Sequence, residues 1–197
     1  MKKAVLLFVV VGLISLVSEA REKSVSLNYS NIGTSTGYWN SGVGLQGKFQ
    51  LKNRLFLLPD AGYLFGRTKT EQHSSNNYGQ VSDSYLFTNI NLGFSLNPGG
   101  YFVLMPYLGA GYYHDFTERR GVSGGSQPGG GLPPGHGAPF DFTENYSTGI
   151  LTANIGILAE AYISDNVFFT FGCKYMIDTH NGNGYAPYFN AGIGFSF

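Results

Sequence analysis

The last 13 residues of the chain, Tyr185 to Phe197 (YAPYFNAGIGFSF), alternate between two kinds of side chain. The even positions are mostly small or polar, and the odd positions are apolar: Tyr185, Pro187, Phe189, Ala191, Ile193, Phe195 and Phe197. Alternation with a period of two is typical of a β-strand whose two faces meet different surroundings. The segment therefore predicts a strand in a sheet with one apolar and one polar face.

Seven further segments repeat this alternation, at 24–29, 39–51, 55–66, 86–96, 101–115, 151–163 and 167–178. An even number of antiparallel strands can close into a barrel with both chain ends on the same side. The connections alternate in length: turn-forming residues make short ones at 52–53, 97–100 and 165–166, and longer ones span 32–37, 67–83, 119–143 and 179–184. This asymmetry is typical of β-barrels that cross a membrane.

Two observations favour a membrane barrel over a soluble, lipocalin-like barrel. A water-facing exterior would be rich in Lys and Glu, but the polar face here carries few charges: Lys48, Asp60, Asp115, Glu160, Lys174 and Asp178. The apolar face has aromatic side chains near both ends: Trp39, Tyr63, Tyr112, Tyr175 and Tyr185 near the long connections, and Phe49, Phe94, Phe102, Phe169 and Phe197 near the turns. We predict an all-β fold, an eight-stranded antiparallel up-and-down transmembrane β-barrel.

Composition narrows the function classes. The chain has 197 residues with 12 basic and 12 acidic side chains, so it lacks the positive charge that a nucleic-acid binder needs. A single Cys excludes a disulfide framework and a Cys-based zinc site. We expect neither a nucleic-acid partner nor a cofactor.

The first 20 residues read as a secretory signal peptide. Lys2 and Lys3 precede a 14-residue apolar stretch, and the small residues Ser18 and Ala20 suit a cleavage site before Arg21. The apolar stretch is shorter than the roughly 20 residues of a membrane-spanning helix. The predicted domain organisation is a signal peptide at 1–20 and one outer-membrane β-barrel domain at 21–197.

Three prolines fit this pattern poorly. Pro59, Pro106 and Pro187 fall inside predicted strands, where each removes a backbone donor from the sheet. Their positions in the alternation place all three on the outward face. We expect local β-bulges at these positions.

The sequence resembles the eight-stranded outer-membrane β-barrel family of Gram-negative bacteria, of the OmpA and OmpX type, over the whole mature chain. The resemblance is carried by 106–112 (PYLGAGY), 163–167 (ISDNV) and the C-terminal 192–197 (GIGFSF). It implies an outer-membrane location with periplasmic ends and extracellular long loops. It also implies that Gly192, Phe195 and Phe197 belong to a C-terminal signal read by the barrel-assembly machinery, although Ala191 replaces the polar residue usual before the glycine.

Four charged side chains are predicted to point into the barrel: Lys48, Asp60, Glu160 and Lys174. Buried charges are costly unless they are paired, so we expect a lumen charge network. Its simplest role is a salt-bridged plug that holds the barrel together. A narrow polar path for ions or small solutes is the alternative.

Other candidate chemistry is weaker. The four histidines, at positions 73, 114, 136 and 180, have no metal-binding spacing, so no metal site is expected. His114 and Ser84 could face each other on adjacent strands, with Asp83 or Glu144 as an orienting acid, as in barrels that hydrolyse lipid A acyl chains. We nevertheless expect that the chain is not an enzyme.

The favoured function is a structural or surface-interaction role through the extracellular loops. The alternatives are a narrow porin-like channel and, less favoured, a lipid-modifying hydrolase. The Gly/Pro-rich connection 119–143 is predicted to be a solvated loop, whose Arg119 and Arg120 could contact lipopolysaccharide phosphates. The expected partners are outer-membrane lipid, lipopolysaccharide and the barrel-assembly machinery, and we expect a monomer.

Overall fold

A computed structural model describes residues 22–33, 39–74, 77–123, 140–179 and 187–197. These residues form eight strands: β1 (Lys23–Gly33), β2 (Trp39–Lys52), β3 (Leu55–Ser74), β4 (Asn77–Phe94), β5 (Phe102–Ser123), β6 (Phe140–Tyr162), β7 (Val167–Asp178) and β8 (Tyr188–Ser196). The predicted all-β class is confirmed. Within the described ranges, no helix has the length and apolar character needed to cross a membrane. The proposed signal peptide at 1–20 lies outside the described residues.

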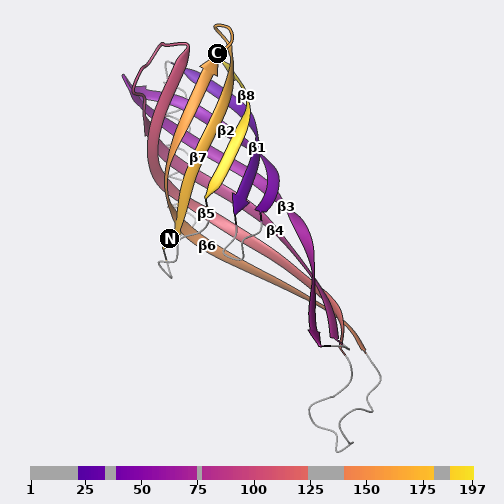
Figure 1. The fold of residues 1–197 in the computed structure, drawn as a ribbon. Helices are drawn as coiled ribbons and strands as arrows, with labels where there is room; N and C mark the ends of the chain where they lie inside the picture. The colour runs from indigo at the N-terminus through magenta and orange to yellow at the C-terminus, as the bar shows by residue number, and fades with distance from the viewer. Residues whose placement is uncertain (1–21, 34–38, 75–76, 124–139, 180–186) are drawn as a thin grey trace, which may run out of the picture.

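The strands form a closed barrel in sequence order (Figure 1). Every neighbouring pair is antiparallel, and β1 pairs with β8 from Ser24↔Ser196 to Ile32↔Tyr188. The amide of Phe197 donates to the carbonyl of Lys23 at 2.9 Å, so the beginning of β1 and the end of the chain lie together at the turn end. Closure gives each barrel strand two neighbours, which a backbone in lipid requires.

Two connections at the turn end contain residues suited to left-handed backbone. Asn53 has a φ of 48° in the turn from β2 to β3, and Gly99 has a φ of 78° in the turn from β4 to β5. Asn and Gly tolerate this conformation better than other residues. The predicted tight turns follow from this chemistry.

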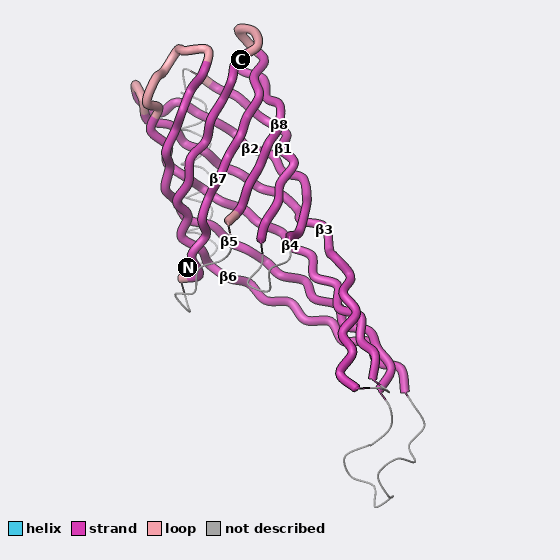
Figure 2. Tube along the Cα trace, in the orientation of Figure 1, coloured by secondary structure: helices cyan, strands magenta, loops and turns pink. Residues whose placement is uncertain are grey.

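Four strands continue far beyond the barrel as one twisted sheet (Figures 1 and 2). Strands β3 to β6 have 20, 18, 22 and 23 residues, whereas β1, β2, β7 and β8 have 9 to 14. We call the part of β3–β6 beyond the barrel the ribbon; it comprises 65–74, 77–84, 114–123 and 140–150. The prediction of loops at 67–83 and 119–143 is therefore wrong. Most of 67–83 and the described ends of 119–143 belong to strands. Backbone pairing continues there, for example Lys69↔Val81 and Arg119↔Glu144.

The outward face of the barrel follows the predicted alternation. In β1, Val25, Leu27 and Tyr29 are exposed, whereas the residues between them are buried. Exposed aromatic side chains lie near both ends of the apolar band: Trp39, Tyr63, Tyr112 and Tyr175 towards the ribbon, and Phe94, Phe102, Phe169 and Phe197 towards the turns. Phe49 is half-buried, and Tyr185 lies outside the described residues. These belts suit the two interfaces of a bilayer.

The expected bulges at the prolines are not found. The pairs Pro59↔Ile90 and Pro106↔Ile157 lie in continuous registers, and Pro187 precedes β8. Register shifts instead occur between Gln50 and Lys52, between Leu64 and Arg67 and between Gln72 and Ser74. A proline is tolerated in a strand where no hydrogen bond of the sheet requires its missing amide. No β-bulge, which would insert an extra residue, is then needed.

The lumen is more apolar than the sequence predicted. One cluster of buried side chains lies in the half near the turns: Phe56, Leu58, Val103, Met105, Tyr107 and Leu158. A second lies near the ribbon: Ile32, Leu64, Tyr85, Phe87, Tyr113, Met176 and Tyr188. Large apolar side chains therefore fill much of the inner face that the sequence indicated as polar. Small buried polar residues are not confined to the layer between these clusters, since Ser24 and Ser95 lie at the turn end and Ser30 lies near the ribbon.

Candidate functional site

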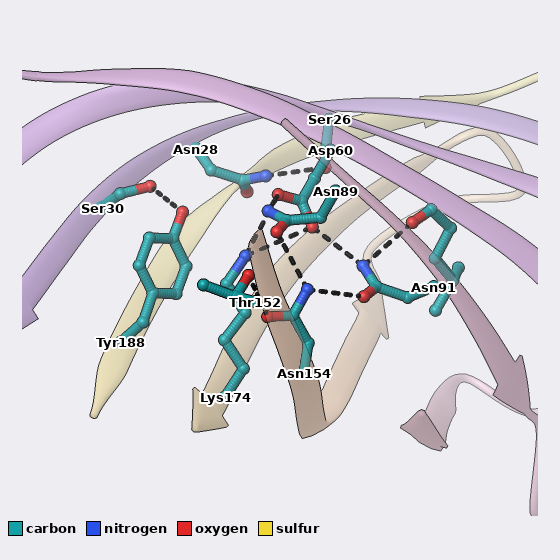
Figure 3. A network of polar contacts seen from close by, with 11 residues as sticks. Ser26, Asn28, Ser30, Asp60, Asn89, Asn91, Thr152, Asn154, Lys174 and Tyr188 are labelled. Atoms are coloured by element: carbon teal, nitrogen blue, oxygen red, sulfur yellow. Dashed lines mark hydrogen bonds and ion pairs between the residues drawn. The ribbon is translucent and has the colours of Figure 1, made fainter. Parts of the chain in front are cut away.

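The middle of the lumen holds a polar layer centred on Asp60 (Figure 3). The Nζ of Lys174 lies 3.1 Å from Oδ1 of Asp60, and these two residues come from β3 and β7, which are not neighbours in the barrel. The side-chain amide of Asn91 donates to Oδ2 of Asp60 at 3.0 Å, and that of Asn89 donates to Oδ1. Asp60 thus accepts from one ammonium and two amides, which compensates the cost of burying its charge.

A second row of contacts extends this layer across the barrel. Asn154 donates to Oδ1 of Asn89 at 2.9 Å, and the hydroxyl of Thr152 lies 3.2 Å from Oδ1 of Asn154. Lys174 is buried, and its Nζ lies 4.2 Å from the centre of the Tyr188 ring, a cation–π distance. The layer therefore ties β3, β4, β6, β7 and β8 together across the lumen.

The other two predicted lumen charges form a separate group nearer the turns. The Nζ of Lys48 lies 2.7 Å from Oε2 of Glu160 and 2.6 Å from Oε1 of Glu22, and it donates to the hydroxyl of Tyr162 at 3.0 Å. Lys48 and Glu160 are buried, whereas the side chain of Glu22 is 40% exposed. Three partners use the three donors of the ammonium group.

The structure thus brings the four predicted lumen residues together as two ion pairs, Lys48 with Glu160 and Lys174 with Asp60, instead of one network. Each pair joins strands that are far apart in the barrel order: β2 with β6, and β3 with β7. Such contacts hold the two sides of the barrel at a fixed separation.

Glycine makes this crowded layer possible at one point. A Cβ at Gly111 would lie 1.9 Å from Oδ1 of Asn89 and 3.0 Å from the hydroxyl oxygen of Thr152. No larger residue fits there unless the polar layer moves. The high glycine content on the inner wall follows from close approaches of this kind.

The C-terminal residues of the predicted assembly signal lie on β8 and at the chain end. Phe195 and Phe197 are exposed on the outward face, at 53% and 76%. Gly192 lies against β1, where a Cβ would lie 2.1 Å from the carbonyl oxygen of Leu27. Their role in assembly stays a prediction.

The structure does not assemble the serine–histidine pair that the sequence suggested. His114 pairs with Leu86 on β4, whereas Ser84 pairs with Phe116. The Nδ1 of His114 lies 3.1 Å from the hydroxyl of Tyr112. The two suggested orienting acids have other contacts: the hydroxyl of Thr117 lies 3.1 Å from Asp83, and Tyr146 donates to Glu144.

No metal-ligand cluster is found among the described residues. His136 and His180 lie outside them, and the backbone of position 73 lies in β3. Cys173 is free and exposed on β7.

Sequence reasoning missed a groove on the outward face of the ribbon. A hollow of about 370 Å³ lies there over β4, β5 and β6; we call it the outer groove and define it by Ser82, Ser84, Phe116, Glu118, Asn145 and Ser147, with Thr117 and Tyr146 completing its lining. The register places Phe116 between Ser84 and Ser147, and Glu118 between Ser82 and Asn145. The signal available in the sequence was Phe116, an aromatic residue that follows Tyr112 and His114 at every second position, just beyond the end of the predicted strand 101–115.

The inner face of the ribbon carries acidic side chains at the barrel mouth. The hydroxyl of Thr117 lies 3.1 Å from Oδ1 of Asp83 and 3.2 Å from Oδ1 of Asp115. Burial raises the pKa of the Asp115 carboxyl, and the nearby Asp83 adds to this shift while the Thr117 contact opposes it.

Closure in sequence order, an uncharged outward band between two aromatic belts and a lumen filled by its own side chains define a class: the small eight-stranded transmembrane β-barrel. Solved outer-membrane proteins share this fold. The outer membrane protein OprG from Pseudomonas aeruginosa matches with a TM-score of 0.59 at 9% identity, over 90% of this chain and 96% of that chain. A major outer membrane protein from Thermus thermophilus matches with a TM-score of 0.55 at 9% identity, over 89% and 99%.

Ail, the attachment invasion locus protein of Yersinia pestis, is 16% identical over 89% of this chain and 97% of that chain, with a TM-score of 0.49. No protein-family model matches the sequence, and no curated protein matches it significantly. The similarities to OprG and to the Thermus thermophilus protein establish that this chain has the fold of an outer-membrane β-barrel. Identity of 9% supports the fold alone and no particular function.

Proposed function

We propose that this chain is a surface-interaction protein of the outer membrane, and that the ribbon is the part that contacts a partner outside the cell. The observation that carries the proposal is the length of β5 and β6. From Tyr113 to Ser123, β5 continues for 11 residues beyond the Tyr112 belt position, about 36 Å of strand at roughly 3.3 Å per residue. A barrel needs only about 9–11 residues per strand to cross the bilayer.

Partner contact would use the open edge of the ribbon formed by β6. Among the described residues, pairing of β6 with β7 begins at Thr152↔Asp178, so 140–150 have no strand on that side. The carbonyl of Leu151 accepts from the amide of Thr179, which shows that the backbone groups of Leu151 point towards β7. Because backbone groups alternate in an antiparallel strand, those of Gly149, Ser147 and Thr143 point to the open edge. An extended segment of a partner could pair there as an added strand.

The orientation of the ribbon is tested by labelling intact cells. Cys173 is first replaced by Ala, and Gln80→Cys then places one exposed thiol in the ribbon. A maleimide that cannot cross membranes should label Gln80→Cys in intact cells. The matched control, Asn53→Cys in the β2–β3 turn, should be labelled only after the outer membrane is permeabilised, and the opposite pattern would refute the orientation.

Strand pairing at β6 is tested with proline. Thr143→Pro removes an amide from the open edge and leaves the ladder between β5 and β6 intact. Adhesion of cells expressing the chain to host cells or matrix should fall by about tenfold, the cost of roughly one hydrogen bond. A chain in which short turns replace the ribbon, at 65–84 and at 114–150, keeps all eight barrel strands. If that chain adhered as well as the intact chain, the proposal would be overturned.

A channel is the alternative, and the packing of the lumen argues against it. Large apolar side chains such as Phe56 and Met105 fill one side of the Asp60 layer, and Phe87 and Tyr113 fill the other. An eight-stranded barrel interior is only wide enough for its own side chains. Planar-bilayer recordings of the refolded barrel should show no stable conductance.

We also propose that the chain is a monomer with no enzymatic activity, with both ends in the periplasm and with Gly192, Phe195 and Phe197 recognised by the assembly machinery. Support for the absence of catalysis is that His114 contacts Tyr112 rather than Ser84. A His114→Ala variant should leave the lipid A acylation profile unchanged in mass spectra.

A further inference from the structure

The outer groove presents an aromatic ring and polar side chains that take no part in the proposed strand pairing at the β6 edge. Phe116 is 42% exposed and forms its centre, and small polar side chains flank it on both neighbouring strands. His114 packs edge-on against Phe116, with ring centres 4.5 Å apart. The ring of Phe116 is thus held in place on one side and open on the other.

Polar groups line both sides of this ring. In the described part of the chain, no side-chain hydrogen bond engages Ser84, Asn145 or Ser147, so their hydroxyl and amide groups are available to a ligand. Arg120 contacts Oε1 of Glu118, through Nε at 2.7 Å and Nη2 at 2.6 Å. The groove therefore offers an apolar surface, several neutral donors and acceptors and a charge that is already neutralised.

This combination fits a sugar ring. One face of a pyranose ring presents C–H groups that pack on an aromatic ring, and its edge carries hydroxyls that both donate and accept hydrogen bonds. Hydroxyl and amide side chains match those hydroxyls. A strongly anionic ligand fits less well, because the nearby Arg120 is already paired with Glu118.

The height of the groove above the bilayer indicates that the sugar belongs to a lipid of the same membrane. Phe116 lies four residues beyond Tyr112, about 13 Å along a strand, or about 10 Å above the aromatic belt at a tilt near 40°. The headgroup layer is only about 5–7 Å thick. The outward stripe Tyr112, His114, Phe116 continues directly from the lipid-facing surface, where Leu86 and Leu151 are exposed.

We propose that the outer groove binds a neutral sugar ring of a glycolipid anchored in the same membrane leaflet. The position of the groove just above the headgroups rests on the orientation given under the proposed function. A lipid-anchored sugar is presented at high local concentration, so a weak site suffices. The contact would fix the base of the ribbon against the membrane surface.

The test uses the full mature chain in detergent micelles, titrated with lipopolysaccharide that carries core sugars or with lipid A alone, and bound lipid is counted by native mass spectrometry. Core-bearing lipid should bind more tightly than lipid A. Phe116→Ala should weaken that binding about tenfold, and Asn145→Ala should weaken it severalfold. The matched control is Tyr175→Ala, which removes a 43% exposed aromatic ring from the outward face of β7, away from the groove, and should leave binding unchanged.

Several outcomes would overturn the inference: equal binding of lipid A and core-bearing lipid, wild-type binding by both groove variants, or an equal loss in Tyr175→Ala. Tight binding of the free core oligosaccharide would contradict the membrane glycolipid as source. Binding in micelles does not depend on which side of the membrane the ribbon faces. A failure of the labelling experiment on Gln80→Cys is therefore distinguishable from a failure of the groove.

Discussion

The ion pair between Asp60 and Lys174 allows a quantitative test of how the lumen is held together. Lys174 is buried and forms an ion pair with Asp60, which also accepts from Asn89 and Asn91, so removal of either charge leaves the other without its oppositely charged partner. Breaking a buried pair in this way costs about 3–5 kcal/mol. We expect Lys174→Met and Asp60→Asn each to lower the free energy of unfolding by roughly 3 kcal/mol.

The double variant separates pairing from simple loss of contacts. With Met at 174 and Asn at 60 no charge is buried, and an Asn side chain still accepts from one neighbouring amide. The double variant should therefore cost no more than either single variant, which corresponds to a coupling energy of about 3 kcal/mol.

Unfolding in urea, in detergent or lipid vesicles, can be followed by the fluorescence of Trp39, the only tryptophan in the sequence. The matched control is Thr170→Val, another buried lumen position, where no described group bonds the hydroxyl. This control should be neutral or slightly stabilising. Additive losses in the double variant, or a Lys174→Met variant within about 0.5 kcal/mol of the wild type, would refute the pairing account.

Substitutions at three other positions test the remaining charge and packing arguments. Glu160→Gln should cost less than Asp60→Asn in the same urea assay, because Glu22 still compensates the buried ammonium group. Gly42→Ala should lower stability by about 1–3 kcal/mol, since its Cβ would lie 2.0 Å from a backbone carbonyl oxygen that cannot move. Asp115→Asn should make stability less sensitive to pH: the raised pKa means that the folded wild type loses stability as pH rises from about 4 through that pKa, and the neutral side chain does not. The variant should match the wild type below about pH 4 and exceed it at neutral pH, and identical pH profiles would contradict this assignment.

The barrel was predictable because lipid and lumen impose opposite demands on successive residues. Val25, Leu27 and Tyr29 are visible in the sequence since their neighbours are small and polar. The same reasoning failed in the ribbon, where both faces meet water and the alternation of polarity disappears. Strand structure there depends on backbone pairing with neighbours, such as Lys69↔Val81, and a single sequence does not display that pairing.

The lumen was only partly predictable. The inward direction of Asp60 and Lys174 follows from alternation, but their meeting depends on the tilt and register of β3 and β7, which lie on opposite sides of the barrel. The apolar clusters were hidden for a different reason. The run 55–58 (LFLL) is apolar on both faces, so Phe56 and Leu58 could not be told from their lipid-facing neighbours.

The two open edges of the ribbon are unlike each other, which favours β6 over β3 as the strand that a partner would join. Proteins protect exposed edges with basic residues, prolines and bulges, because an unprotected edge recruits other strands. The β3 edge carries Arg67 and Lys69 and two register shifts, whereas 142–150 of β6 (FTENYSTGI) has no Lys, Arg or Pro and pairs with β5 without a shift. A regular edge without these protective features exposes the protein to aggregation. A protein that keeps such an edge despite this hazard is expected to use it for pairing with a partner strand. If β6 is that edge, basic substitutions such as Ser147→Lys should weaken partner binding, whereas Thr68→Lys on β3 should leave it unchanged.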